Sequence, residues 1–336
     1  MKISIITPSF NQAQFLEETI LSVLNQNYPK IEYIIIDGGS TDGSVEIIKK
    51  YEKYLSYWIS EPDQGQSAAI NKGLKKASGE IVTWLNSDDK FLESALFKIA
   101  GHFLHSPDVG LIYGGVAFDE EKNSETNFGY DNPCLERYMA GMAFPQPAAF
   151  FRRSLLEKTG YLNEKYHYGM DYDLFSRFAL ITQFKKTNDI FSYYRIHPTS
   201  KSVKNYYLFI EEWIDVFLSL SENLQLKKTI SALKNLKVFD NYLRKTTVLY
   251  TKFSVQNIQV DEDKLLLYFL SYVIRGWYAA GKFEECKIVL NYIQKNYSQS
   301  LIAQEEGIPY IEKRLYYFPI SILKLWRKIS RDIEKF

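Results

Sequence analysis

Two adjacent carboxylates, Asp88 and Asp89, follow the apolar run 81–86 and carry the clearest chemical meaning in this chain. Neighbouring negative charges at the end of a buried strand cost Coulomb energy, which a cation or hydrogen-bond donors must offset. Because successive side chains of a strand point to opposite faces, we expect the two aspartates to meet different partners. One partner would be a polar group of a ligand and the other a metal ion. A solvated acidic pair in a loop is the alternative.

The elements that position this pair can be read from the first hundred residues. Apolar runs typical of buried strands alternate there with amphipathic helical patterns. The strand runs are 3–7, 33–37, 57–60 and 81–85, and the helical patterns are 11–25, 44–54 and 66–77. This alternation predicts an α/β fold with a mostly parallel sheet covered by helices. Ligands of such sheets bind beyond the carboxyl ends of the strands. The polar clusters of the chain lie there, at residues 7–9, 37–40, 61–63 and 86–89.

The later part of the chain changes character. Residues 100–200 look mixed, with strands expected at 111–113, 148–152, 184–186 and 192–196 and a helix at 170–181. From residue 206 onward, long helical patterns contain no glycine until Gly276. We therefore expect a first domain over 1–202 and an all-α C-terminal domain over 203–336. Within the second domain, residues 265–296 read as a helical hairpin that turns at Gly281.

The bulk composition excludes several classes of protein. The 336 residues include 41 Lys and Arg against 40 Asp and Glu, a formal net charge of +1, so no global field indicates nucleic-acid binding. The two cysteines, Cys134 and Cys286, are far apart, which argues against a zinc or disulfide scaffold and suits a reducing compartment. The first residues do not resemble a signal peptide, and the longest apolar stretch, 265–274, is too short to span a bilayer. We expect a soluble, cytoplasmic protein.

A dinucleotide-binding domain is the first rival within the α/β class. Its phosphate-binding turn needs closely spaced glycines between the first strand and the first helix. The corresponding turn here, residues 7–11, contains no glycine. The same absence excludes a Walker phosphate-binding loop.

Three of the polar clusters have a purely structural alternative. Asp37 could accept from a ribose hydroxyl or a base N–H, or could form an Asx-turn that leads into the next helix. Asp63, in the rigid turn 61–66, could instead cap the helix that follows. Asn71 and Lys72 could simply lie on a solvated helix face.

Four motifs in register resemble family 2 glycosyltransferases, which have the GT-A fold. They are TPSFNQAQFLEETILSVLNQNYP, IIIDGGSTDGS, SEPDQGQSAAINKGLKKASGEI and WLNSDD. The resemblance covers roughly residues 1–200. It implies a nucleotide-diphosphate sugar as donor, a divalent metal (Mn²⁺ or Mg²⁺) as cofactor, and direct displacement with inversion at the anomeric carbon. Residues 1–100 would then form the nucleotide-sugar half and 101–202 the acceptor half.

The resemblance also implies positions for individual residues. Asp89 would be the metal ligand, and Asp88 would lie toward the ribose or the donor sugar. The base and ribose would be surrounded by Thr7, Pro8, Asp37, Glu61 and Asp63. The full nucleotide-sugar group comprises Thr7, Pro8, Ser9, Asn11, Asp37, Gly38, Glu61, Asp63, Gln64, Gly65, Asn71, Lys72, Asn86, Asp88 and Gln146.

A base must also take the proton of the acceptor hydroxyl. Residues 168–175 resemble the family segment that carries this acid, where many members have Glu-Asp and this chain has Met170-Asp171. Asp171 is therefore the candidate base, and a position in the first helical turn would favour its ionised form. An ordinary acid at a helix N-terminus has the same geometry. Asp173 is the second candidate and is expected to be structural.

Two further residues complete the expected site. His197, after the last expected strand, would join Asp89 at the metal or the diphosphate; a surface histidine is the alternative. The segment 146–153 resembles the lining of the donor-sugar and acceptor pocket, in which Gln146 has free hydrogen-bonding capacity. Phe150 and Phe151 alternate across a strand there, so we expect one of them to lie in the core.

The C-terminal segment 319–336 has the pattern of a basic amphipathic helix. Its apolar residues, Ile322, Leu325, Trp326, Ile329, Ile333 and Phe336, fall on one face. Such a helix can lie on an anionic membrane or pack on the helical domain, and we expect the packing.

The sequence therefore predicts a metal-dependent inverting glycosyltransferase that uses a UDP- or dTDP-sugar, with a saccharide or a lipid-linked molecule as acceptor. Cell-surface polysaccharide or glycolipid synthesis would be its setting. A non-catalytic nucleotide-sugar-binding scaffold that works through its helical domain is the alternative. A processive synthase is disfavoured because no membrane span is expected.

Overall fold

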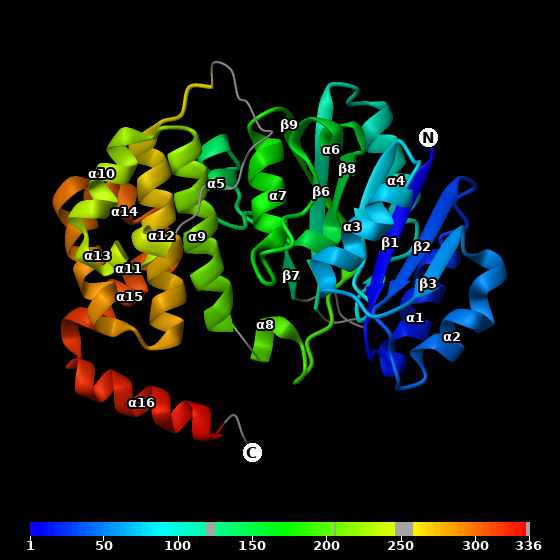
Figure 1. Ribbon diagram of the computed structural model, residues 1–336. Coiled ribbons are helices and arrows are strands. Elements are labelled where there is room, and N and C mark those ends of the chain that lie inside the picture. Colours follow the sequence, from blue (N-terminus) through cyan, green and yellow to red (C-terminus); the bar gives the residue numbers. More distant parts are fainter. Residues whose placement is uncertain (119–124, 205, 246–257, 334–336) are drawn as a thin grey trace. The chain divides into compact units, whose positions relative to one another are not determined.

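A computed structural model describes residues 1–118, 125–204, 206–245 and 258–333 (Figure 1). The described chain forms two compact units. The sheet unit contains Met1–Pro133 and Met142–Ser200, and the helical unit contains Cys134–Gly141 and the described residues from Lys201 onward. The sequence had placed the whole of 1–202 in the first domain, so the segment 134–141 differs from that expectation.

The first half of the sheet unit follows the predicted alternation. Its strands are β1 (Ile3–Ser9), β2 (Ile31–Asp37), β3 (Tyr57–Ser60) and β4 (Ile81–Trp84), and its helices are α1 (Ala13–Leu24), α2 (Ser44–Tyr51) and α3 (Gln66–Lys76). β1 pairs in parallel with both β2 and β4, and β2 pairs in parallel with β3. The run Ile34–Ile36 is fully buried because helices cover the sheet on both faces.

The second half extends the same sheet. Its strands are β5 (Lys90–Phe91), β6 (Val109–Ala117), β7 (Thr126–Asn127), β8 (Ala149–Arg152) and β9 (Gln183–Tyr193), and its helices are α4 (Ala95–Leu104), α6 (Ser154–Thr159) and α7 (Met170–Ala179). A short 3₁₀ helix, Gln146–Ala148, precedes β8. The strand order is β3-β2-β1-β4-β8-β6-β9-β5, with β7 paired to β6.

The second half is mixed rather than mostly parallel. β8 runs antiparallel to both β4 and β6, whereas β9 runs parallel to β6. β9 is also one long strand, not the two short ones expected, because its polar middle is accommodated where the pairing with β6 shifts register. Gly114 makes this possible, since a Cβ there would lie 2.3 Å from the carbonyl oxygen of Asp189.

Both faces of the sheet are packed with aromatic side chains. Phe150 stacks on Phe91 and belongs to the core on the α1 and α4 face. Phe151 packs against Phe178 of α7, on the other face. Both residues therefore lie in the core, one more than the sequence predicted, because helices cover both sides of β8.

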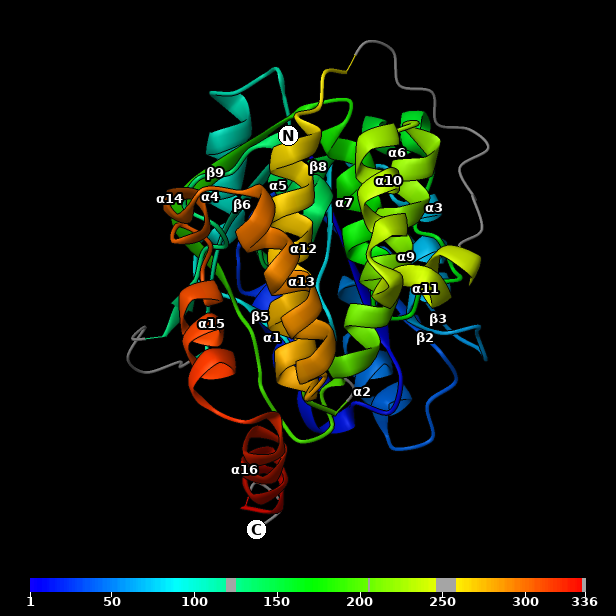
Figure 2. The same ribbon diagram turned by 90° about the vertical axis from the view of Figure 1, so that its left-hand side faces the viewer.

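The helical unit contains the remaining helices. They are α5 (Leu135–Ala140), α8 (Lys201–Lys204), α9 (Tyr206–Asn223), α10 (Lys227–Asn235), α11 (Asp240–Lys245), α12 (Glu262–Ala280), α13 (Phe283–Asn296), α14 (Gln299–Ile302), α15 (Ile308–Tyr317) and α16 (Ile320–Ile333). Figure 2 shows α12 beside α13. The predicted hairpin is confirmed, and Gly281 ends α12 at a φ of +81°.

The segment 134–141 joins the helical unit through α5. The guanidinium of Arg137 donates two hydrogen bonds to the buried carboxylate of Glu305, at 2.8 and 2.6 Å, and lies 3.5 Å from the ring centre of Tyr268. A helix of one and a half turns cannot bury its own apolar side chains, so α5 docks on α12. Periodicity along the chain does not reveal this long-range packing.

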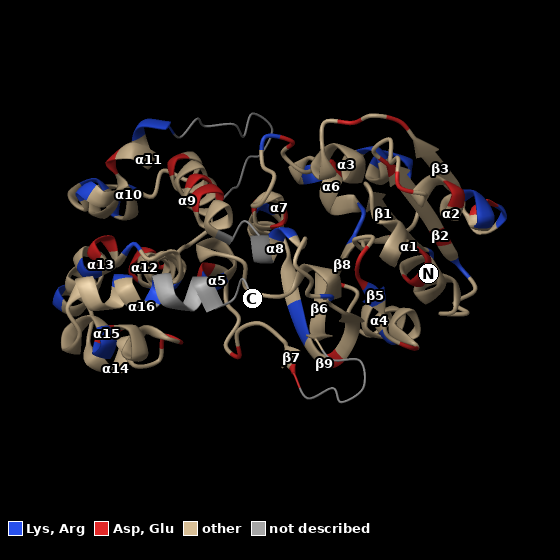
Figure 3. Ribbon diagram, turned by 90° about the horizontal axis from the view of Figure 1, so that it is seen from below, with Lys and Arg blue, Asp and Glu red and all other residues tan. Residues whose placement is uncertain are grey.

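Figure 3 shows basic and acidic residues interspersed over both units, as the near-equal counts indicate. Among the described residues, no helix combines the length and the apolar character needed to cross a bilayer.

Candidate active site

The loop after β4 separates Asp88 and Asp89 by their surroundings. Asp89 is 1% exposed. Its Oδ2 accepts from Nδ2 of Asn86 at 3.1 Å, and its Oδ1 accepts from the backbone N–H of Arg195 at 3.1 Å. Burial, together with the charge of Asp88, raises the pKa of Asp89 well above its usual value. Asp89 is thus held inside the protein by two donors.

Asp88 faces a different partner. Its side chain is 21% exposed, and its Oδ2 lies 3.0 Å from Nε2 of His197. The other ring nitrogen of His197 lies 2.8 Å from the hydroxyl of Thr199, and the imidazole packs on Phe15 with ring centres 4.6 Å apart. The imidazole is therefore oriented from both sides.

The two aspartates do meet different partners, while a metal shared by Asp89 and His197 stays a prediction. His197 contacts Asp88, whereas Asp89, the expected companion of His197, is buried in protein hydrogen bonds. The reason is local: the N–H of Asp89 bonds back to the carbonyl of Asn86, so the chain turns there instead of continuing as a strand. Strand alternation does not apply within a turn.

Arg195 clamps this loop and was not identified from the sequence as a site residue. Its Nη2 donates to Oε2 of Glu18 at 2.6 Å, and its Nε donates to the carbonyl oxygen of Asp88 at 3.1 Å. The guanidinium also lies 4.6 Å from the ring centre of Phe15. On the other side, the hydroxyl of Thr19 lies 2.9 and 2.8 Å from the carbonyl oxygens of Ser87 and Asp89. Helix α1 therefore supports the loop, and no local pattern in the sequence marks Glu18 or Thr19.

The ends of β1 and β2 supply the next group of expected ligand residues. The hydroxyl of Thr7 lies 3.1 Å from that of Tyr33, and Pro8 is buried beside it. Ser9 is buried, and its hydroxyl has no hydrogen-bond partner among the described residues. A buried, unpaired hydroxyl at the carboxyl end of a central strand is a group that a ligand could satisfy.

Asp37 is hydrogen-bonded within its own loop and to Ser60 of β3. Its carboxylate accepts from the N–H groups of Gly39 and Ser40 and from the hydroxyls of Ser40 and Ser60, at 2.6 to 3.1 Å. The Asx-turn alternative therefore describes the observed side chain. Asn11 braces the same loop, since its Oδ1 accepts from the N–H of Thr41 at 2.9 Å.

The turn before α3 lies against this loop. A Cβ on Gly38 would approach Oδ2 of Asp63 to 3.0 Å, so glycine lets the two segments meet. Oδ1 of Asp63 accepts from the N–H of Gly65 at 2.7 Å, which shapes the turn before the helix; the cap position itself is Gly65, at a φ of +106°. Gln64 is exposed, and Glu61 pairs with Lys72.

Asn71 and Gln146 are both buried amides. Asn71 is buried, and its amide bonds both the carbonyl oxygen and the N–H of Leu162, at 2.9 and 3.0 Å, so a solvated face is wrong for it. Gln146 is also buried, and its Nε2 donates to the carbonyl oxygen of Trp84 at 2.9 Å; its Oε1 has no hydrogen bond among the described residues, so its predicted contact with a ligand stays a prediction. Both amides fasten chain segments that are far apart in the sequence.

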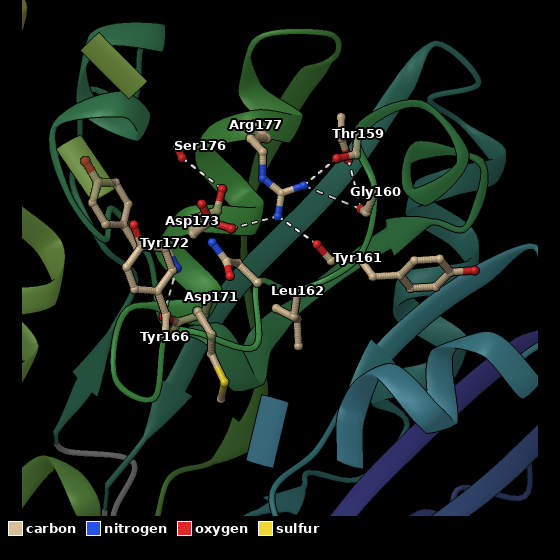
Figure 4. Close-up of polar contacts among 12 residues, drawn as sticks. Thr159, Gly160, Tyr161, Leu162, Tyr166, Asp171, Tyr172, Asp173, Ser176 and Arg177 are labelled. Atoms are coloured by element: carbon tan, nitrogen blue, oxygen red, sulfur yellow. Dashed lines mark hydrogen bonds and ion pairs between the residues drawn. The ribbon is translucent and has the colours of Figure 1, made fainter. Parts of the chain in front are cut away.

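Asp171 lies in the first turn of α7, half-buried, and its Oδ1 accepts from the N–H of Tyr172 at 2.8 Å (Figure 4). The chain just before it contacts the start of α3: the hydroxyl of Ser67 donates to the carbonyl oxygen of Tyr166 at 2.7 Å and lies 2.8 Å from the sulfur of Met170. The candidate base is thus next to the helix that follows the turn 61–66.

Asp173 is held in a buried ion pair, and its structural role stays a prediction. It is fully buried and bonds Nη2 of Arg177 at 2.7 Å. Arg177 also donates to the carbonyl oxygens of Thr159 and Tyr161, at 2.6 and 2.8 Å (Figure 4). The pair of Asp173 and Arg177 thereby fixes the loop that leads into α7. Of the two acids in the first turn of α7, Asp171 is the one that is partly exposed.

Asp88 and His197 together offer a carboxylate oxygen and an imidazole nitrogen. Within the described ranges, no three His, Cys, Asp or Glu side chains are grouped as they would be around a metal ion. Hard divalent cations commonly combine one or two carboxylates with substrate phosphates and water. The residues present therefore fit a cation bound jointly with a diphosphate and not a preformed protein cage.

Comparison with known proteins places these residues in context. Residues 4–160 match the family model described as glycosyl transferase family 2. An uncharacterized glycosyltransferase of Mycobacterium tuberculosis is 33% identical over 183 residues, which cover 54% of this chain and 70% of that protein. A Campylobacter jejuni protein named GalNAc(5)-diNAcBac-PP-undecaprenol beta-1,3-glucosyltransferase is 26% identical over 81% of this chain and 94% of its own length.

Two solved structures share the fold. Staphylococcus aureus TarS 1–349 in complex with UDP has a TM-score of 0.57 at 16% identity, covering 100% of this chain and 92% of that chain. The mannosyltransferase PcManGT from Pyrobaculum calidifontis, in complex with GDP-Man and Mn²⁺, has a TM-score of 0.56 at 17% identity, covering 98% and 84%. These similarities confirm the GT-A type of α/β fold.

Proposed function

Because the chain belongs to glycosyl transferase family 2, we propose that this glycosyltransferase moves a sugar from a nucleotide diphosphate to a saccharide or lipid-linked acceptor, with inversion. The donor is a UDP- or dTDP-sugar, and residues 1–100 bind it while residues 101–202 receive the acceptor. Cell-surface glycan synthesis is the setting. The free cysteines Cys134 and Cys286 support a cytoplasmic location.

One observation carries this proposal: a partly exposed Asp88 held at the carboxyl end of β4 beside an oriented His197. Arg195 and Thr19 fix the loop that presents it. Holding Asp88 next to the carboxylate of Asp89 has an electrostatic cost, which a bound cation and donor would offset.

The chemical step is a direct displacement. The acceptor hydroxyl oxygen forms a bond to the anomeric carbon while the bond from that carbon to the diphosphate oxygen breaks, and the nucleoside diphosphate leaves. We assign the acceptor proton to Asp171, whose position in the first turn of α7 favours its charged form. Attack on the face opposite the leaving group inverts the anomeric centre.

We assign the divalent cation, Mn²⁺ or Mg²⁺, to Asp88 and His197. When bound, the cation would neutralise charge on the departing diphosphate. The structure of PcManGT in complex with GDP-Man and Mn²⁺ supports a cation in this fold. Asp89 then acts as a buried support of the loop and not as the direct ligand expected from the sequence.

The donor and the acceptor follow from the relatives. UDP bound to TarS supports a uridine nucleotide, and the undecaprenol-linked saccharide in the name of the Campylobacter jejuni relative supports a lipid-linked acceptor. In the nucleotide subsite, we assign ligand contact to Ser9, with its unpaired hydroxyl, and close backbone approach to Gly38. The roles proposed for Asp37, Asn11, Asp63 and Asn71 are to shape this subsite through the loops they hold.

The function is tested in two steps with the full chain. Thermal shift against UDP-, dTDP- and GDP-sugars, with and without Mn²⁺, identifies the donor. Asp171→Asn should then keep donor affinity and lower the rate of transfer by roughly 10²- to 10⁴-fold, since it removes the base. Asp131→Asn is the matched control, because that side chain is fully exposed.

Two results would overturn the proposal. Normal transfer by Asp171→Asn would reject Asp171 as the base. Absence of nucleotide release with every donor that shifts the melting temperature would favour the alternative, a nucleotide-sugar-binding scaffold.

A further inference from the structure

Exposed apolar side chains are concentrated at the junction of α15 and α16 in the helical unit. Of the 15 large apolar residues that are exposed in the described chain, five lie within residues 310–325. They are Tyr310, Tyr316, Tyr317, Ile322 and Leu325. Single exposed apolar residues are ordinary, but a concentration of this kind marks an interaction surface.

On α15 these side chains share the exposed arc of the helix. Ile308, Ile311 and Leu315 are buried, so the opposite side carries Tyr316, 82% exposed, and Tyr317, 66% exposed. The two rings are perpendicular with centres 5.2 Å apart. Tyrosine has an apolar body and a polar tip, which suits the boundary between water and lipid.

On α16 the apolar stripe is not the face that packs. Leu323 is buried, and the side chain of Arg327, four residues later, lies against Gly281. Ile322 and Leu325, by contrast, are exposed, the latter by 56%. Each residue is rotated by about 100° around the helix axis from the one before it. Ile322 and Leu325 therefore point away from the side of the helix that carries Leu323 and Arg327. The sequence had favoured packing of this stripe on the helical domain, and for Ile322 and Leu325 that is wrong.

The sequence placed four more apolar residues on the same face as Ile322 and Leu325. Their side chains are not among those that the structure describes: Trp326, Ile329, Ile333 and Phe336. Figure 1 shows α16, in red, following α15 at the end of the helical unit. The described part of this surface comprises α15 and the first turns of α16.

A groove with basic residues adjoins the tyrosines. A cavity of about 350 Å³ lies between α13 and α15, and its lining includes Lys287, Lys313, Tyr316 and Tyr317. Glu312 also lines it and accepts from Nε2 of Gln294 at 2.6 Å, so this acid already has a partner. Residues 308–325 contain three basic side chains and one acidic, in a chain whose total charge is only +1.

We propose that the surface formed by Tyr310, Lys313, Tyr316, Tyr317, Ile322 and Leu325 docks on an anionic lipid bilayer. The tyrosines and the start of the α16 stripe enter the interfacial region, and the lysines attract the headgroup charge. Lys287 and Lys313, which line the cavity, would meet a headgroup phosphate there. This surface would hold the enzyme where lipid-linked molecules are found, but it does not depend on which acceptor is used.

The test is co-sedimentation of the full chain with vesicles of phosphatidylcholine alone or with phosphatidylglycerol added. We expect pelleting with the anionic vesicles only, and its loss at high salt. Tyr316→Ser combined with Tyr317→Ser should lower the partition coefficient by roughly tenfold. Lys313→Glu should lower it by a similar factor, because it reverses a charge at the surface.

Matched controls use the same changes elsewhere. Tyr54→Ser changes a tyrosine of the sheet unit that is 55% exposed, the same fraction as Tyr310, and Lys234→Glu reverses an exposed charge on α10. Both should pellet like the unchanged chain. Donor binding by thermal shift, without vesicles, should be equal for all variants, which separates this proposal from the proposed function.

Two results would overturn the lipid surface. Equal pelleting of the tyrosine and lysine variants and the unchanged chain would exclude these residues as the contact. A vesicle-independent dimer in analytical ultracentrifugation that dissociates in the tyrosine variant would show that a second copy of the chain covers this surface instead.

Discussion

Single side chains decide how the two adjacent aspartates differ. Asp89 is buried between an amide and a backbone N–H, and Asp88 faces His197 at a partly exposed edge. The two residues are of the same type, so the difference arises from the backbone turn between Asn86 and Asp89. Each carboxylate can therefore be tested by the same small substitution.

Asp89→Asn should lower the free energy of unfolding by about 1–3 kcal/mol, because one of the two donors now faces an NH₂ group. Asp88→Asn should leave the melting temperature unchanged and weaken Mn²⁺-dependent donor binding by roughly tenfold or more. Calorimetric titration of UDP with and without Mn²⁺, beside thermal unfolding, measures both. If the Asp89→Asn variant is as stable as the unchanged chain but its UDP binding no longer depends on Mn²⁺, Asp89 is the metal ligand, as the sequence predicted.

Glu18 and its neighbour Glu17 allow a paired comparison on α1. Glu18→Gln removes an anchor of Arg195, and we expect KM for the donor to rise severalfold with little change in kcat, as the loop becomes less well ordered before binding. Stability should change by less than about 1 kcal/mol, since the Glu18 side chain is 53% exposed. Glu17→Gln, which breaks an exposed contact with Lys50, should alter neither parameter. Equal kinetics for the two variants would count against a positioning role for Arg195.

Among the strands and helices, a polar network joins β1, β2 and the turn before β4. The carboxylate of Glu32 accepts from Lys2, Ser4 and both the N–H and the hydroxyl of Ser78, at 2.5 to 2.7 Å. Burial alone would raise its pKa, but these donors outweigh burial and lower the pKa of Glu32 to about 2. The three segments are thereby tied at the end of the sheet opposite the site.

This network predicts acid sensitivity. Since the pKa is lower in the folded state than in the unfolded one, the stabilisation is present above about pH 4.5 and is lost as the pH falls toward 2. The loss should reach roughly 3 kcal/mol. Urea unfolding at a series of pH values measures it, and Glu32→Gln should flatten the dependence in this window. Glu80→Gln, at an exposed pair with Arg152, should retain it; if it does not, Glu32 is not the cause.

For the chain as a whole, one short segment from the middle of the sheet unit's sequence belongs to the helical unit. Residues 134–141 leave the sheet unit in sequence and join the helical unit through the ion pair of Arg137 with the buried Glu305. The helical unit is therefore built from two separate parts of the chain. Both parts are needed to bury its core.

Arg137→Met should lower the free energy of unfolding of the helical unit by about 3–5 kcal/mol, because Glu305 is left buried without its partner. The double variant Arg137→Met with Glu305→Met should recover most of that loss, since neither charge is then buried alone. Chemical denaturation followed by tryptophan fluorescence reports the change. A double variant as unstable as the single one would mean that packing on Tyr268, and not the charge, is what Arg137 supplies.

The sequence by itself determined the alternating elements of the first half, the helical hairpin and the family, because these depend on local periodicity and on motifs that are contiguous in the chain. It also located the clusters at the carboxyl ends of the strands, since parallel pairing brings those ends to one edge. Only the tertiary structure decided which aspartate meets His197, that Asn71 and Gln146 fasten distant segments, and that α5 belongs to the helical unit. Those outcomes depend on contacts between residues up to 168 positions apart, and such contacts leave no periodic trace along the chain.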